Sequence, residues 1–179
     1  GASVSAVVSG TVTPLYSTLS PLVSRAFVGS ITDTNVLDRL LAEFEVDCVY
    51  HLAALLSTRA EFTPTAAHEV NVDGTLKLLE FARKQGEAHG RPVVFLYPSS
   101  IAAHGFPDLD TKMRVGRVRE DDFNRPTTMY GCNKLYCEQL GRYYTHHYKQ
   151  LSADAVRRVD FRCLRFPGLI SAVTTPSGG

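Results

Sequence analysis

The sequence lacks the features that mark membrane-spanning, nucleic-acid-binding and disulfide-rich proteins. None of its apolar runs approaches the ~20 residues that a transmembrane helix requires. Its 19 basic and 18 acidic residues leave a formal net charge of +1, which favours neither nucleic acid nor a membrane surface. The four cysteines include no CxxC pair, and Gly1–Ser9 carries no basic stretch of the kind that opens a signal peptide. We therefore expect a cytoplasmic protein with reduced, packed thiols and no bound metal.

Regular patterns are also scarce in residues 1–28, which hold one charged residue, Arg25, among many Ser, Thr and Pro. We expect this region to be irregular, apart from two possible short strands at residues 6–8 and 26–28. Apolar residues in the remainder of the chain, 29–179, alternate between strand and helix patterns. The expected strands are residues 47–53, 93–97 and 159–166, and the first two are apolar runs suited to burial. The expected helices are 32–45, with Asp33 as a cap or first-turn acid, 64–84 and 128–148, and residues 105–126 are expected to be a long loop. Because strands separated by helices need crossover connections, the pattern predicts an α/β fold with a doubly wound parallel sheet.

The strongest local chemical signal is the pair Tyr130 and Lys134. Residues four apart lie on one face of a helix. A nearby ammonium favours the phenolate and lowers the pKa of a tyrosine, which makes the pair a possible proton-transfer device. The same spacing is also common on solvated helix faces, so the pair alone does not decide between the two interpretations.

Two serines, Ser99 and Ser100, follow an expected strand about thirty residues earlier. Ligands bind beyond the carboxyl ends of strands in parallel sheets, so a serine there can hydrogen-bond a substrate oxygen. The alternative is that the serines only satisfy backbone groups where the strand stops. Two histidines near strand ends have the simpler interpretation: His51 is expected to have a satisfied ring, and His104 is expected to be a packing residue.

Five motifs together resemble those of the extended short-chain dehydrogenase/reductase family, and they occur in the family's order. They are Asp47–Ser57 for the fourth strand, Asn71–Thr75 for VNxxGT, Pro98–Gly105 for SSxxxYG, Pro126–Lys134 for PxxxYGxSK, and Arg165–Gly168 for RxPG. The segments around Ser57, Thr127 and 161–171 most resemble the L-threonine 3-dehydrogenase branch.

This resemblance implies a role for each matching position and a Rossmann-like fold that binds NAD. The catalytic residues are then Ser100, Tyr130 and Lys134. The cofactor-binding positions are Leu52, Ala53, Ala54, Asn71, Ser99, Lys134, Pro167 and Gly168. The substrate-binding positions are Ser57, Thr127 and Thr128. The implied partners are a small-molecule substrate and a second copy of the protein in a homodimer.

The sequence departs from the family at its N-terminal side. The glycine-rich turn GxxGxxG, whose backbone grips the pyrophosphate at a helix N-terminus, is absent, and Ser9–Thr11 does not replace it. Ser30 and Ile31 stand where the family has Asp before an aliphatic residue. We therefore expect residues 1–179 to form one partial Rossmann-like domain, incomplete at its N-terminal side and without the family's C-terminal substrate part. Such a chain should have an unprotected sheet edge, bind NAD weakly and be inactive alone.

Three functions remain open at this point. The first is an NAD-dependent oxidoreductase that transfers hydride with a Ser/Tyr/Lys triad, acting on a small hydroxy acid or hydroxy amino acid. The second is a nucleotide-sugar epimerase or dehydratase that uses the same cofactor. The third is a non-catalytic binding protein with this fold, which the missing phosphate loop favours and the intact triad disfavours.

Overall fold

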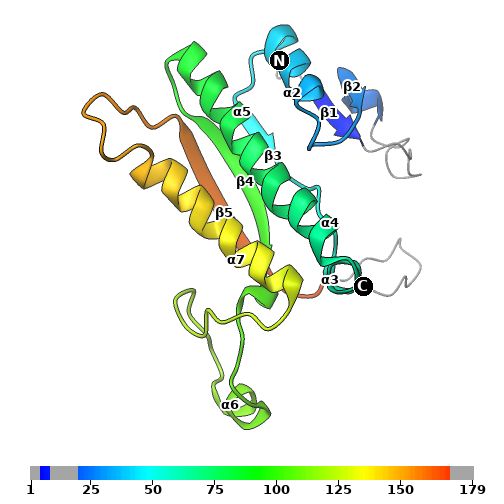
Figure 1. Cartoon of the computed structure of the whole chain (residues 1–179), viewed down its shortest axis with the longest axis vertical. Helices are drawn as coiled ribbons and strands as arrows, with labels where there is room; N and C mark the ends of the chain where they lie inside the picture. The colour runs from blue at the N-terminus through cyan, green and yellow to red at the C-terminus, as the bar shows by residue number, and fades with distance from the viewer. Residues whose placement is uncertain (1–4, 9–19, 170–179) are drawn as a thin grey trace.

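The computed structural model describes residues 5–8 and 20–169, which form parallel strands and the helices that pack on them (Figure 1). In chain order the elements are β1 (Ser5–Val8), η1 (Ser20–Leu22), β2 (Arg25–Val28), α2 (Thr34–Glu43), β3 (Cys48–Tyr50), α3 (Ser57–Phe62), α4 (Pro64–His68), η2 (Glu69–Asp73), α5 (Gly74–His89), β4 (Val93–Ser100), η3 (Ile101–Ala103), α6 (Leu109–Arg114), α7 (Met129–Arg142), η4 (Tyr143–His147) and β5 (Val159–Phe166). The expectations for Ser9–Thr11 and for residues 170–171 lie outside the described residues. No described helix is both long and apolar enough to cross a bilayer.

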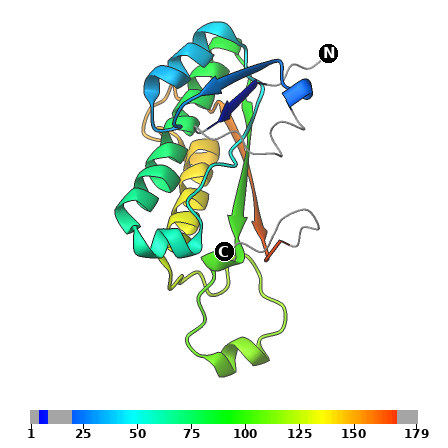
Figure 2. The same cartoon turned by 90° about the vertical axis from the view of Figure 1, so that its right-hand side faces the viewer.

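All described strand pairs are parallel. Strand β4 lies between β3 and β5, and Phe95 stands opposite Val49 on one side and Phe161 on the other. Strands β1 and β2 form a separate parallel pair. Helices α5 and α7 cover one face of the three-stranded sheet (Figure 2). The predicted parallel α/β architecture is therefore confirmed, and the three strands of the main sheet among the described residues agree with an incomplete fold.

The core lies between β4 and the two long helices. Alternate β4 residues, from Val93 through Phe95 and Tyr97 to Ser99, point into this layer and are buried. Helix α2 extends the core toward β2, because Val36, Leu37 and Leu40 share one of its faces and join the same cluster as Phe27. Asp33 caps α2 by accepting a hydrogen bond from Asn35 N at 2.9 Å, as the sequence indicated.

The opposite face of the three-stranded sheet is exposed in the described part of the chain. Tyr50 on β3 is 69% exposed and Leu164 on β5 is 67% exposed. Strand β3, expected to be buried, is instead a short strand that pairs only with β4 among the described residues. The expectation of burial was wrong here because the apolar run has neither a second neighbouring strand nor a covering layer in this part of the molecule.

Three segments differ from their predicted form. The expected helix 64–84 begins at Pro64 as predicted but passes through the π-helical turn η2 before continuing as α5 to His89. The expected helix 128–148 is α7 followed by a second π-helical turn, η4. The expected loop 105–126 contains α6, which Asp108 caps by accepting from Thr111 N at 2.6 Å. The expected irregular region contains β1 and β2, in line with the two short strands considered there.

Candidate active site

Tyr130 and Lys134 lie on the first two turns of α7, which Thr128 caps by accepting a hydrogen bond from Gly131 N at 3.1 Å. The Lys134 side chain turns inward and is 4% exposed. Its Nζ donates to Pro98 O at 2.7 Å and lies 5.4 Å from the centroid of the Tyr130 ring. The ammonium therefore lies beside the phenol, and the solvated-face interpretation of the pair does not hold for Lys134.

The first turn of α7 packs directly on the segment that follows Ser100. An ideal Cβ built on Gly131 would lie 2.1 Å from Ala102 O, so only glycine permits this approach. Ser100 ends β4 and caps η3, because its Oγ accepts from Ala102 N at 3.1 Å. The packing of Gly131 on Ala102 thus brings the Tyr130 end of α7 to the carboxyl end of β4. The shared cleft for the two hydroxyls stays a prediction.

Burial shifts the proton affinities of both α7 residues. Desolvation raises the pKa of the Tyr130 phenol above its ordinary value. Desolvation also lowers the pKa of the Lys134 ammonium, although Cys137, Cys163 and Glu138 oppose this effect. Burial is the cause of the raised pKa of Tyr130 in this structure, and the lowering effect of the Lys134 ammonium, 5.4 Å from the ring centroid, stays a prediction.

Asn71 holds the segment after β3 in place from the π-helical turn η2. Its Oδ1 accepts from Leu55 N at 2.7 Å, and its Nδ2 donates to Leu55 O at 3.0 Å and to Asn133 Oδ1 at 3.2 Å. Asn71 is 2% exposed, so these bonds are shielded from water. The structure therefore places Asn71 as a brace for residues 52–56, which include the expected cofactor positions Leu52, Ala53 and Ala54. Leu52 itself is 75% exposed.

His51 lies behind the same segment and is 3% exposed. Its Nε2 is 2.8 Å from Thr75 Oγ1, whose hydroxyl donates to Asn71 O. Because that hydroxyl proton is already used, Nε2 carries the ring proton and Nδ1 is the acceptor. Burial, with a smaller effect of Lys134, lowers the pKa of His51 to about 4. His51 is therefore neutral, and its ring is only half satisfied, because Nδ1 is buried without a hydrogen-bond partner.

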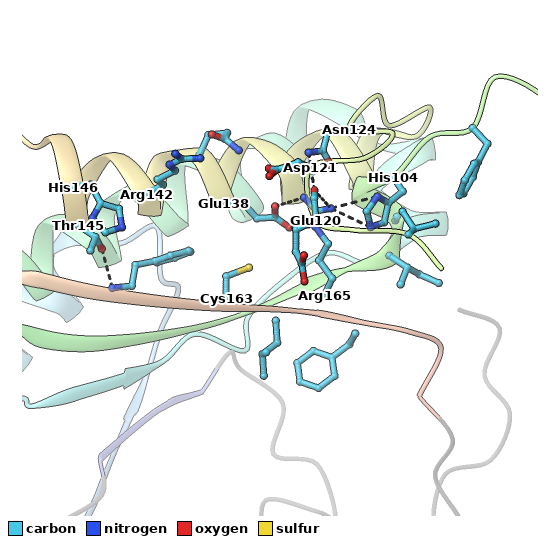
Figure 3. Close-up of a pocket in the computed structure, with 18 of the residues that line it drawn as sticks. His104, Glu120, Asp121, Asn124, Glu138, Arg142, Thr145, His146, Cys163 and Arg165 are labelled. Atoms are coloured by element: carbon cyan, nitrogen blue, oxygen red, sulfur yellow. Dashed lines mark hydrogen bonds and ion pairs between the residues drawn. The ribbon is translucent and has the colours of Figure 1, made fainter. Parts of the chain in front are cut away.

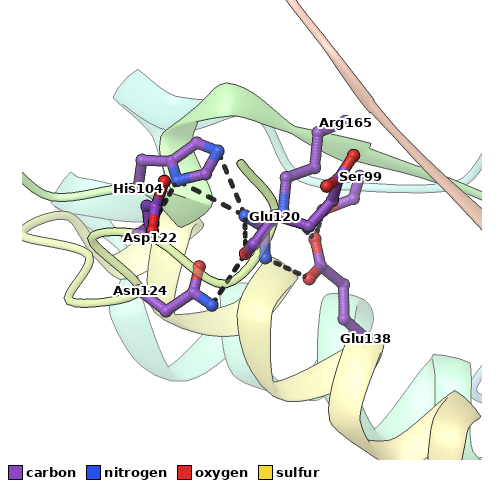
Figure 4. Close-up of polar contacts among 7 residues, drawn as sticks. All are labelled: Ser99, His104, Glu120, Asp122, Asn124, Glu138 and Arg165. Carbon is purple, nitrogen blue, oxygen red and sulfur yellow. Dashed lines mark hydrogen bonds and ion pairs between the residues drawn. The ribbon is translucent and has the colours of Figure 1, made fainter. Parts of the chain in front are cut away.

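Ser99 points into the buried layer between β4 and α7. It is 3% exposed, and its Oγ donates to Glu138 Oε1 at 2.5 Å (Figure 4). Glu138 in turn accepts from Arg165 through both carboxylate oxygens, at 2.8 and 2.6 Å. The Ser99 hydroxyl is therefore already hydrogen-bonded within the protein, and its expected contact with the cofactor stays a prediction.

His104 belongs to the same polar network. Arg165 Nη1 donates to His104 Nε2 at 3.1 Å and to Glu120 O at 2.8 Å. His104 Nδ1 lies 2.9 Å from Asp122 O, which fixes it as the protonated nitrogen. His104 thus connects β5 to the returning loop through hydrogen bonds (Figure 4), and the expectation of simple packing was wrong.

The expected substrate positions are exposed and lie on neighbouring elements. Ser57 begins α3, and Thr127 and Thr128 precede α7. Helices α3 and α7 pack together, and Glu61 Oε2 accepts from Met129 N at 3.1 Å. Pro167 and Gly168 follow β5 and are exposed.

A cavity of about 1100 Å³ lies next to this site rather than within it. Figure 3 shows it between α7 with η4, strand β5 and the loop after His104. Glu138, Arg142, Cys163 and Arg165 line it. Its lining includes none of Ser100, Tyr130 or Lys134, so we do not assign the cavity to the catalytic residues.

A family profile describing GDP-mannose 4,6 dehydratase matches residues 10–156. The chain belongs to this family. An uncharacterized epimerase/dehydratase from Staphylococcus aureus strain USA300 is 40% identical over 149 residues, which cover 83% of this chain and 40% of that protein. The chain thus spans less than half the length of this curated relative.

Solved structures give the same result for the fold. L-threonine dehydrogenase from Clostridium difficile is 34% identical, with a TM-score of 0.75 over 97% of this chain and 48% of that one. UDP-glucose 4-epimerase from Thermus thermophilus, solved in complex with NAD, is 24% identical with a TM-score of 0.59 over 79% of this chain and 40% of that one. The chain is therefore a partial extended short-chain dehydrogenase/reductase, and it is threonine dehydrogenase-like.

The described residues fit the nicotinamide end of a dinucleotide better than its phosphates. The Lys134 ammonium donates one N–H to Pro98 O, so its other two N–H groups can donate hydrogen bonds to ribose hydroxyl oxygens. Residues 52–54 lie at the carboxyl end of the sheet, where Leu52 and Ala53 are exposed, and Asn71 holds the adjacent Leu55. No glycine-rich turn for the pyrophosphate occurs in the sequence.

Proposed function

We propose that the protein containing this chain is an NAD-dependent oxidoreductase of the extended short-chain dehydrogenase type. One observation carries the proposal: a buried ammonium, Lys134, is held by Pro98 O beside the Tyr130 phenol on the helix that packs against the end of β4. The membership of the family and the dehydrogenase neighbours support this function over a non-catalytic binding role.

In the proposed reaction Tyr130 accepts the proton of a substrate hydroxyl, and bound NAD supplies the hydride acceptor. Lys134 stabilises the phenolate that must form and contributes hydrogen bonds to the cofactor ribose. The Ser100 hydroxyl donates a hydrogen bond to the reacting oxygen and keeps its own proton. Because burial raises the pKa of Tyr130, the proposal requires that Lys134 stay protonated when the phenol loses its proton.

For the substrate we propose a small 2-amino-3-hydroxy acid such as L-threonine. The support comes from the neighbours named as L-threonine dehydrogenases and from the sequence around Ser57 and Thr127. Nucleotide-sugar epimerisation or dehydration is the second candidate, which the family profile and the curated epimerase/dehydratase relative favour.

The two candidates are separated by assaying the full-length protein with NAD. L-Threonine should give net NADH, measured by absorbance, whereas a UDP-hexose should give none and should not be epimerised. Epimerisation of a nucleotide sugar without net NADH would reject the dehydrogenase proposal and establish the second candidate.

We also propose that residues 1–179 alone bind NAD weakly and do not turn over substrate. Helix N-terminal amides supply much of the grip on a pyrophosphate. Calorimetric titration of this chain with NAD tests the idea, and binding in the micromolar range would contradict it.

A further inference from the structure

The bidentate ion pair between Arg165 and Glu138 has no role in the proposed proton transfer, yet it is among the least exposed ion pairs described. Both side chains are 11% exposed. A second pair on the same strand, Arg162 with Asp160, is 61% and 40% exposed. Exposed pairs contribute little, whereas breaking one partner of a buried pair leaves an uncompensated charge. Loss of either partner of the Arg165–Glu138 pair would therefore leave an uncompensated charge close to the residues packed around it.

The pair joins the two elements that carry the proposed catalytic residues. Glu138 lies one turn after Lys134 on α7, in the series 130, 134, 138 that shares a helix face. Arg165 stands opposite Ser99 in the register of β4 and β5, and Ser99 donates to the same Glu138 oxygen that accepts from Arg165 Nε. Ser100 is the next residue of β4. One carboxylate therefore connects helix α7, the end of β4 and β5.

Arg165 also fixes the loop that leaves the site. Its Nη1 donates to Glu120 O and to His104, and Asn124 donates to the same Glu120 oxygen at 2.8 Å. The Arg165 side chain therefore connects α7 with the loop that follows His104.

We infer that Arg165 and Glu138 are positioning residues of the proposed site: their ion pair fixes α7 to β5, the Ser99 hydrogen bond to Glu138 ties α7 to the end of β4, and the pair keeps two largely buried charges balanced beside Lys134. The inference rests on the proposed function only for the roles of Tyr130 and Lys134. Neither Arg165 nor Glu138 is assigned a contact with substrate or cofactor.

The charge balance has a measurable consequence at Tyr130. Eight residues of α-helix separate Tyr130 from Glu138, or ~12 Å along the axis. At an effective dielectric constant of ~20, one unpaired charge at that distance shifts a pKa by ~1 unit. The other titratable groups that face Tyr130 or Lys134 from the packed elements are His51, Glu61, Tyr97, Cys137 and Cys163. None of these changes in the variants below.

The test places a single fluorinated tyrosine at position 130 of the full-length protein and follows its titration by ¹⁹F NMR. Glu138→Gln leaves Arg165 unbalanced, so the phenol pKa should fall by up to ~1 unit. Arg165→Met leaves the Glu138 carboxylate without its arginine partner, so the phenol pKa should rise by a similar amount. The double variant removes both charges and should return the pKa close to its original value.

Two further variants serve as controls: one keeps the charge at position 165, and the other removes a different arginine from the same strand. Arg165→Lys keeps the positive charge but loses the bidentate hydrogen bonding to Glu138, so the pKa of the Tyr130 phenol should stay near its original value. Arg162→Met removes the exposed arginine of the same strand and should leave the titration unchanged. If Arg165→Met does not fold, Glu138→Gln and the double variant decide the question.

A purely structural pair would shift the titration in the same direction in both single variants, and most in the double variant. That pattern, or no shift in Glu138→Gln, would overturn the inference. Because the titration needs no turnover, it is read independently of whether the protein oxidises L-threonine.

Discussion

Replacing Asn71 with alanine should destabilise the protein because this buried side chain satisfies three hydrogen-bonding groups at once. Asn71 is 2% exposed and bonds Leu55 N, Leu55 O and Asn133 Oδ1 at 2.7, 3.0 and 3.2 Å. Each hydrogen bond contributes about 0.5–1.5 kcal/mol net. Asn71→Ala should therefore lower the free energy of unfolding by ~3 kcal/mol.

Urea unfolding of the full-length protein measures this loss, with the midpoint falling and the slope unchanged. Asn35→Ala is the control, because Asn35 is exposed in the first turn of α2 and should change stability by less than ~0.5 kcal/mol. Amide exchange at Leu55 should also become faster in Asn71→Ala. A loss no larger than that of Asn35→Ala, or unchanged exchange at Leu55, would refute the bracing role of Asn71.

Three more substitutions test the surroundings of the site. Lys134→Met should weaken NAD binding, measured by calorimetry. It should also move the rising limb of the pH–activity profile to higher pH, because the cation that favours the phenolate is lost. Initial rates measure this profile, and an unchanged profile would contradict the role of Lys134. The pKa of His51 is about 4 in the folded protein and 6.5 in the unfolded chain. Between pH 4 and 6.5 the unfolded state therefore binds more protons than the folded state. The free energy of unfolding should fall by up to ~1.4 kcal/mol per pH unit as the pH drops from 6.5 toward 4. His51→Gln should flatten that slope in urea titrations, and an unaltered slope would show that His51 is not the responsible group. Gly131→Ala should lower the free energy of unfolding by ~1–3 kcal/mol, because the added Cβ forces α7 away from Ala102 O. Gly168→Ala is the control and should leave stability unchanged, because no atom lies within 4 Å of its added Cβ. Equal thermal stability of the two variants would contradict the close packing at Gly131.

The alternating architecture was predictable because hydrophobic periodicity and capping residues act locally. The cap at Asp33, the helix start at Pro64 and the strand 159–166 each follow from a few adjacent residues. The π-helical turn at Glu69–Asp73 was not predictable, because it depends on the contacts that Asn71 makes with distant segments. The exposure of β3 depends on which layers surround it, which its own apolar sequence cannot specify.

The candidate site divides in the same way. Tyr130 and Lys134 were found from their spacing on one helix, and Asn71 from its place in a motif. Glu138 and His104 were missed as site residues, because their importance arises from Arg165, which is 27 residues from one and 61 from the other in sequence. The spacing of four between Lys134 and Glu138 was the signal that could have drawn attention to the glutamate.

The central claim, that Tyr130 transfers the proton in the protein's reaction, is tested most directly by Tyr130→Phe in the full-length enzyme. Proton transfer by a positioned side chain typically contributes about 10²–10⁴-fold, so kcat for NAD-dependent oxidation of L-threonine should fall by that factor with KM little changed. Tyr136→Phe, at a 54% exposed position on the same helix, should leave kcat unchanged. Full activity in Tyr130→Phe would contradict the claim.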